Sequence, residues 1–195
     1  MRPPARFKSV SAGGDYTCAL RADNTLTCWG FNPFGQTNAF AGSFKSVSAG
    51  ADQACAVRLD DTLACWGANF DGQLNVPAGA FKSVSSGGDH VCAVKPDDTL
   101  ICWGRNQSGQ TNAPAGSFKS VSAGARHNCA VKADDTLTCW GDNPSGGTNA
   151  PAGSFKSVSA GGFHSCGVKA DDTLACWGDG DDGETNAPSP DLAAR

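Results

Sequence analysis

The sequence predicts an all-β fold: a five-bladed β-propeller with one four-stranded blade of 37 residues per repeat. Two observations support this prediction. The tetrapeptide Phe-Lys-Ser-Val recurs five times at an unbroken step of 37 residues, beginning at Phe7. Each repeat also holds short strand-like segments bounded by Gly, Asn, Asp and Pro, and no segment has the periodicity of a helix. Four strands in roughly 40 residues are typical of one propeller blade.

The first repeat allows the strands to be placed. They are predicted at about 8–12, 16–21 and 25–30, with a short fourth strand at about 36–39. The small residues of the first strand suit the crowded axis of a propeller. The second and third strands carry bulky side chains for packing between neighbouring blades. The chain, residues 1–195, is therefore expected to be one propeller domain, with blades at about 7–43, 44–80, 81–117, 118–154 and 155–191.

The ends of the chain bear on whether the propeller closes. Pro3 occupies the same repeat position as Phe40 and Pro77, so the chain holds five units and few further residues. This count favours a closed ring whose ends meet at one seam. The alternative is a piece of a larger ring, in which the outermost blades would present uncovered strands.

Each repeat contains two cysteines that are ten residues apart. In an antiparallel hairpin with a three-residue loop at 22–24, the first two would lie opposite each other, with Cα atoms about 4.5 Å apart. We therefore expect five disulfides within the repeats and a secreted or extracytoplasmic location, with any signal peptide outside this chain. The alternative is ten buried thiols. The expected pairs are Cys18–Cys28, Cys55–Cys65, Cys92–Cys102, Cys129–Cys139 and Cys166–Cys176.

Composition and motifs exclude several functions. A formal net charge of −4 argues against nucleic-acid binding, and no apolar run is long enough to span a membrane. Phosphate loops, serine nucleophile elbows and zinc-protease motifs are absent, and five near-copies of a blade place unlike catalytic groups poorly. The acidic segment 179–184 lacks the full EF-hand pattern and is expected to be an exposed loop. We expect no enzyme activity, no cofactor and no metal site.

Two repeated positions carry side chains that could serve chemistry or packing. The histidine position holds His90, His127 and His164 but also Tyr16 and Gln53, which a catalytic or metal-binding histidine would not tolerate. A hydrogen-bonding role at the rim is expected instead. The tryptophan position lies on a strand between bulky neighbours, so packing between blades is favoured over a sugar-stacking shelf.

The repeats differ from one another on one predicted face. The loops after the first and third strands vary, whereas the turns after the second strand and the links between repeats are nearly uniform. Variable loops on a rigid scaffold favour contact with a partner. The variable face carries nine carboxylates and two arginines, a balance of −7, which favours a basic partner surface. The alternative to partner binding is that the acidic face only keeps the protein soluble. The residues expected to bind the partner are Asp15, Tyr16, Phe31, Phe34, Asp52, Phe70, Asp71, Asp89, Arg105, Arg126, Asp142, Phe163 and Asp181.

The segment Ser85–Gly116 resembles the repeat of the regulator of chromosome condensation family, and within it the bacterial propellers that inhibit β-lactamases. The shared elements are Ser-Gly-Gly-x-His, Ala-Val-Lys-x-Asp, Trp-Gly-x-Asn-x-x-Gly-Gln and Thr-x-x-Pro. The resemblance implies a propeller with a binding role. Eukaryotic members usually have seven longer blades, and their nucleotide-exchange role uses elements inserted outside the plain repeat, for which this chain has no place. The cysteine pair is absent from the inhibitor but is similar to that of extracellular bacterial relatives.

These observations favour a non-enzymatic binding module that presents variable loops to a protein partner, and the resemblance implies an inhibitor. A multivalent lectin is the alternative, because weak carbohydrate sites repeated around a ring gain from avidity. Lectin sites should be alike between blades, however, and these loops are not. A third hypothesis is an engineered or recently amplified repeat scaffold without a ligand.

Overall fold

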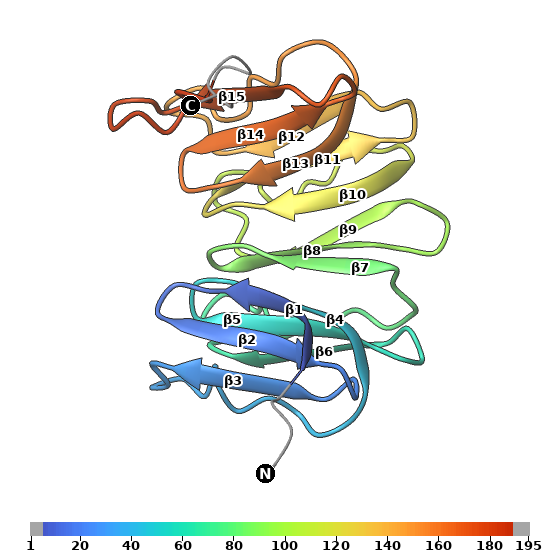
Figure 1. Ribbon diagram of the computed structural model, residues 1–195. Coiled ribbons are helices and arrows are strands. Elements are labelled where there is room, and N and C mark those ends of the chain that lie inside the picture. The colour runs from blue at the N-terminus through green and yellow to red at the C-terminus, as the bar shows by residue number, and fades with distance from the viewer. Residues whose placement is uncertain (1–5, 189–195) are drawn as a thin grey trace.

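The computed structural model describes residues 6–188, which contain fifteen β-strands and no helix. The strands form five antiparallel sheets, one per repeat, each with three strands in sequence order (Figure 1). The predicted all-β fold with five propeller blades is confirmed. Blades 1 to 5 are, in order, β1 (Phe7–Ala12), β2 (Tyr16–Arg21) and β3 (Leu26–Gly30); β4 (Phe44–Ala49), β5 (Gln53–Arg58) and β6 (Leu63–Gly67); β7 (Ser83–Ser86), β8 (His90–Val94) and β9 (Leu100–Gly104); β10 (Phe118–Ala123), β11 (His127–Lys132) and β12 (Leu137–Gly141); and β13 (Phe155–Ala160), β14 (His164–Lys169) and β15 (Leu174–Gly178).

A tight turn between the second and third strands sets the register of every blade. In blade 1 the side chain of Asp23 accepts hydrogen bonds from the amide and the hydroxyl of Thr25, at 3.0 and 2.7 Å. Asn24 adopts a φ of 69°, a left-handed conformation that Asn and Asp tolerate better than other non-glycine residues. The turn therefore pairs Cys18 with Cys28, and the other four blades repeat this register.

The predicted fourth strand is absent from the described blades. In blade 1 the amide of Asn38 donates to the carbonyl of Gly35 at 2.9 Å, and the amide of Ala39 donates to Thr37 at 3.0 Å. These local bonds form a compact turn, so this backbone is not free to extend a sheet ladder. The prediction was wrong because the turn-forming Gly and Asn residues outweigh the short strand-like pattern.

Neighbouring blades pack through one interface that the chain uses four times. The indole of Trp66 donates to the carbonyl of Gln36 at 2.8 Å, and the tryptophans of blades 3, 4 and 5 make the equivalent bond to the preceding blade. Nearer the axis, the amide of Ala49 donates to the hydroxyl of Ser11 at 2.9 Å. The phenylalanines at or just before the first strands of blades 2 to 5, beginning at Phe44, are at most 1% exposed and form much of the apolar core.

Glycine is required where the blades approach each other near the axis. A Cβ atom added to Gly87 would lie 2.4 Å from the carbonyl oxygen of Gly124 in the next blade. A Cβ added to Gly50 would likewise lie 2.4 Å from the carbonyl oxygen of Gly87. The small residues predicted for the axis are therefore needed for direct backbone contact between blades.

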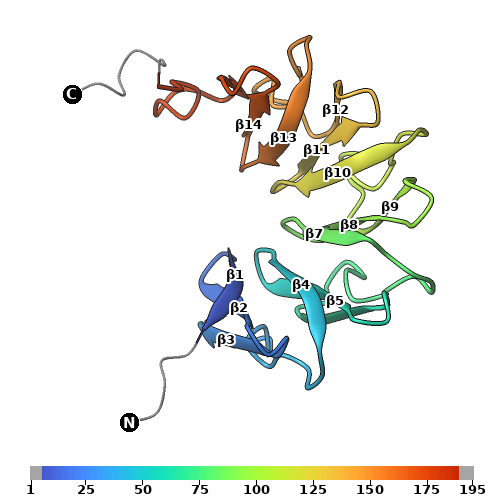
Figure 2. The same ribbon diagram turned by 45° about the vertical axis from the view of Figure 1, so that its right-hand side comes forward.

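The five blades follow an open arc and do not close into a ring (Figure 2). Trp29 in blade 1 is 52% exposed, whereas Trp66 is 4% exposed. Val10, on the same uncovered side, is 67% exposed. Within residues 6–188 no hydrogen bond joins blade 5 to blade 1, and a Cβ added at Gly162 would meet no atom within 4 Å. The predicted closure was therefore wrong, because the repeated interface does not bring the last blade back to the first. Pro3 lies outside the described residues.

Candidate functional site

The variable loops gather on one face of the arc. In blade 1 the amide of Phe31, after the third strand, donates to the carbonyl of Asp15, after the first strand, at 2.9 Å. The same bond joins Ala68 to Asp52 and Arg105 to Asp89. We call this surface the loop face; it comprises residues 13–15 and 31–38 and their equivalents at each 37-residue step.

The opposite face, here called the turn face, comprises residues 22–24 and 40–43 and their equivalents. Its charges are largely engaged within the scaffold. Lys45 contacts Asp61, and Lys82 and Lys156 form the equivalent ion pairs with the aspartates of their own blades at 2.5 and 2.6 Å. The amide of Phe44 also donates to the carbonyl of Asn24 at 2.8 Å, joining blade 2 to blade 1. Backbone bonds at the turn face therefore join neighbouring blades, whereas its ion pairs stabilise single blades.

Aromatic side chains protrude from the loop face over blades 1 and 2. Phe34 and Phe70 come from equivalent loops of the two blades and meet edge to face, with ring centroids 5.1 Å apart. They are 43% and 71% exposed, and Phe31 on the first loop is 56% exposed. Exposed aromatic groups of this kind mark interaction sites more often than they serve stability. These three residues are called the aromatic patch.

Buried amide side chains hold the loops that carry this patch. The side-chain carbonyl of Gln36 accepts a bond from the amide of Phe34 at 3.0 Å, and that of Gln73 accepts one from the amide of Asp71 at 2.9 Å. Asn32 accepts a bond from the amide of Thr37 at 2.8 Å. Both glutamines are fully buried. These two residues were not predicted from the sequence, although the Gly-Gln pair common to repeats 1 to 3 was an available signal.

Charge is distributed unevenly over the loop face. The loop face has two arginines, Arg105 in blade 3 and Arg126 in blade 4. Arg105 forms an ion pair with Asp89 at 3.2 Å. Arg126 and the aspartate of its own blade are 3.9 Å apart. In blades 1 and 2 the loop-face carboxylates form no ion pair with any residue between 6 and 188, and their loops contain no Lys or Arg. These uncompensated carboxylates are Asp15, Asp52 and Asp71.

The predicted partner-binding residues occupy different environments. Tyr16 is 3% exposed, and its hydroxyl donates to the carbonyl of Gln53 in the next blade. Burial raises the pKa of this phenol well above its usual range. Tyr16 was therefore wrongly predicted as a contact residue. Of the others, Asp15, Phe31, Phe34, Phe70, Asp71, Arg126, Phe163 and Asp181 are exposed, and Asp52, Asp89, Arg105 and Asp142 are partly buried.

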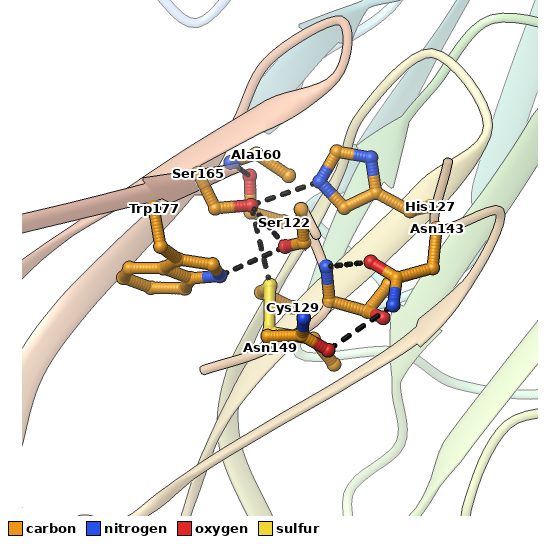
Figure 3. Close-up of a disulfide and its surroundings, with 11 residues drawn as sticks. Ser122, His127, Cys129, Asn143, Asn149, Ala160, Ser165 and Trp177 are labelled. Atoms are coloured by element: carbon orange, nitrogen blue, oxygen red, sulfur yellow. Dashed lines mark hydrogen bonds between the residues drawn. A yellow bond between two sulfur atoms is a disulfide. The ribbon is translucent and has the colours of Figure 1, made fainter. Parts of the chain in front are cut away.

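The histidine position lies between blades. Nε2 of His90 is 2.8 Å from the side-chain oxygen of Asn128, and Nε2 of His127 is 2.8 Å from the hydroxyl of Ser165 (Figure 3). The expected hydrogen-bonding role is confirmed for His90 and His127, but their position at the rim was wrong, because both rings are almost completely buried. His164 is partly buried, and its side chain forms no hydrogen bond with the residues between 6 and 188. Burial lowers the pKa of both imidazoles and so favours the neutral form of each ring.

Each blade contains one disulfide between its second and third strands, as predicted. The Cα atoms of each pair are 4.0 to 4.1 Å apart. The disulfide of Cys129 lies beside the interface between blades 4 and 5, where the indole of Trp177 donates to the carbonyl of Gly147 at 2.8 Å (Figure 3). The tryptophan position therefore serves packing between blades, as expected, except at the uncovered Trp29.

A cavity of about 400 Å³ opens at the axis, where the first strands end. It is lined by the Ala-Gly-Gly segments of all five blades or their close variants, and it contains no titratable side chain.

Among residues 6–188 no group of three His, Cys, Asp or Glu side chains is arranged to hold a metal ion. Those residues also contain no helix that could cross a membrane. The acidic loop at 179–184 is closed by local bonds: the amide of Asp181 donates to the side-chain carboxylate of Asp179 at 3.3 Å, and the amide of Gly183 donates to the carbonyl of Gly180 at 3.0 Å.

Several solved structures are similar to this chain. The CRINKLY ectodomain of the Arabidopsis thaliana receptor kinase ACR4 shares 28% identity and a TM-score of 0.75, over 91% of this chain and 67% of that one. The ectodomain of the Physcomitrella patens receptor kinase CR4 shares 29% identity and a TM-score of 0.77, over 89% and 50%. Yeast RCC1 (Prp20) shares 19% identity and a TM-score of 0.79, over 90% and 57%, which shows the fold alone. The chain spans 50% to 67% of the length of these three proteins.

No curated protein matches the sequence. The model of the regulator of chromosome condensation (RCC1) repeat, however, matches each of the five repeats, at residues 7–36, 44–73, 81–110, 118–146 and 155–184. These matches cover most of the chain and coincide with the five blades. The chain belongs to the family of regulator of chromosome condensation (RCC1) repeats.

Proposed function

We propose that the chain is a non-enzymatic binding module that docks a protein partner on its loop face. The observation that carries this proposal is the exposed contact between Phe34 and Phe70, at the tips of rigid loops on the face where the repeats differ. Aromatic side chains dominate the energetics of many protein interfaces. The opposite face is uniform and is engaged in holding the blades together.

The comparisons support a binding role in general terms. Two similar structures are ectodomains of receptor kinases, and a study of Prp20p from Saccharomyces cerevisiae describes its binding properties to Gsp1p and histones. Five disulfides favour an oxidising compartment, so we propose a partner that is encountered outside the cytoplasm.

An inhibitory role is the more specific form of this proposal, and it rests on the resemblance to the bacterial propellers that inhibit β-lactamases. A rigid loop face can cover the entrance of an enzyme without performing any chemistry itself. The buried glutamines that hold the loops of blades 1 and 2 suit this role, because they reduce the conformational entropy lost on binding.

Site-specific photo-crosslinking tests the proposal. A photoreactive phenylalanine analogue placed at Phe34 on the loop face is compared with the same analogue at Leu59 on the turn face. The two side chains are 43% and 49% exposed, so the positions are matched in accessibility. Exposed to the extracellular proteins of its source, the first variant should capture one defined partner that the second does not. Identical adducts from both positions, or none from Phe34, would contradict a partner-binding loop face.

A further inference from the structure

The geometry points to a more specific partner site, confined to blades 1 and 2, that takes a basic protein segment with Arg or Lys next to an apolar side chain. This inference rests on the proposed function and names the chemistry of its partner. Three features of the two blades support it: the aromatic patch, the uncompensated carboxylates, and the hydrogen bonds that anchor the loops carrying both.

The aromatic patch offers a surface for both parts of such a segment. Because Phe34 and Phe70 meet edge to face, only one face of one ring is covered by the other ring. A ring face attracts a cation through the quadrupole of its π-system, and its edge accepts apolar contact. The chain already makes this kind of contact internally: the guanidinium of Arg58 lies 5.3 Å from the ring centroid of Phe44.

The carboxylates beside the patch favour a positive partner. Asp15, Asp52 and Asp71 have no compensating cation on the loops of blades 1 and 2, whereas both arginines of the loop face sit over blades 3 and 4. Uncompensated charge on a fixed surface raises the local concentration of an oppositely charged partner and its rate of association. The same charges repel an acidic segment, which provides specificity.

Blade 5 provides an internal comparison. Its loop is more acidic, but it presents a single exposed aromatic residue, Phe163, and no aromatic pair. Two of its acidic side chains are also engaged by the loop itself, with the amide of Asp182 donating to Glu184 at 3.1 Å and the amide of Asp181 donating to Asp179. Acidity and aromatic contact therefore coincide only over blades 1 and 2 among the described residues.

Defined peptides test this chemistry directly. Three peptides of equal length are titrated into the isotope-labelled chain: one of Arg, Leu and Gly, a second with Glu in place of Arg, and a third with Ser in place of Leu. Amide chemical shifts locate the binding, and calorimetry measures the affinity. We expect the Arg–Leu peptide to bind most tightly, with shifts concentrated in residues 31–35 and 68–72. Equal binding of the Glu peptide, or shifts centred on blade 5, would overturn the inference.

Matched variants separate the contributions. F34A together with F70A should weaken binding of the Arg–Leu peptide at least about tenfold. The pair F34L and F70L keeps apolar area but removes the π faces. It should weaken binding of the Arg–Leu peptide more than binding of a fourth peptide that contains only Leu and Gly. D71N should weaken binding and reduce its dependence on salt. The controls F163A and D181N, both at exposed positions of blade 5, should leave affinity unchanged.

The outcome is distinguishable from a failure of the proposed function. If photo-crosslinking at Phe34 captures a partner but neither F34A with F70A nor D71N affects the Arg–Leu peptide, only the inferred partner chemistry is wrong. Thermal melting of every variant provides the folding control. D71N, F163A and D181N change exposed side chains, so unchanged melting temperatures are expected for them. F34A with F70A also removes the contact between the two rings, so a small decrease is expected there.

Discussion

The tryptophans offer a matched pair for testing the repeated blade interface. Trp66 and Trp29 occupy the same position in successive blades, but among residues 6–188 only Trp66 binds a preceding blade. In W66F the indole N–H that reaches the carbonyl of Gln36 at 2.8 Å is lost, and the carbonyl becomes a buried acceptor without a partner. Such a loss costs about 1–3 kcal/mol, and the smaller ring adds a cavity contribution.

The expected total for W66F is thus about 2–4 kcal/mol of unfolding free energy. Trp29 is 52% exposed and makes no equivalent bond to any residue between 6 and 188, so W29F should change the unfolding free energy by less than about 0.5 kcal/mol. Guanidinium chloride unfolding followed by far-ultraviolet circular dichroism measures both variants without relying on indole fluorescence. Equal destabilisation by the two substitutions would refute the reasoning, because it would place Trp29 in a blade interface of its own.

Three further predictions concern the scaffold. Burial lowers the pKa of His90 and His127, so the free energy of unfolding should be greatest above the unfolded-state pKa of about 6.5 and should fall as the pH drops below it. The double variant H90Q with H127Q introduces the residue that blade 2 carries at this position, Gln53, and it should make the free energy of unfolding less dependent on pH. Urea titrations at several pH values measure this dependence. Replacing Cys92 and Cys102 with Ala should lower the unfolding free energy by about 2–3 kcal/mol, measured by denaturation without reductant, and no loss would mean that the short loop contributes nothing. G87A should lower the melting temperature because its Cβ would meet the carbonyl of Gly124 at 2.4 Å, whereas G162A should leave it unchanged; a comparable drop in both would show that Gly162 also faces a neighbouring blade.

The blades were predictable from sequence because their signals are local and repeated five times. The turn at 22–24 and the cysteine pairs fix the register of each hairpin, so the disulfides followed from spacing alone. The contrast between variable loops and uniform turns also placed the two faces correctly. The fourth strand failed because a turn closed by Gly and Asn can resemble a short strand when only the pattern of residues is considered.

Other features depend on how blades meet, which a repeated sequence does not specify. The number of repeats does not determine the angle between blades, so closure could not be derived from counting. Tyr16 looked like an exposed anchor in a variable loop, yet its ring fits between blades and its hydroxyl reaches Gln53. The contact between Phe34 and Phe70 joins two repeats, and only the arrangement of neighbouring blades brings these loops together.

The central structural claim is that one interface between blades is used four times and leaves blade 1 uncovered. Fluorine NMR of the chain labelled with fluorotryptophan tests it most directly, with W29F used to assign the signal of Trp29. If blade 1 is uncovered, the signal of Trp29 should show the largest solvent isotope shift of the five tryptophans. A soluble paramagnetic agent should also increase its relaxation rate the most. A Trp29 signal as protected as that of Trp66 would contradict the open arc.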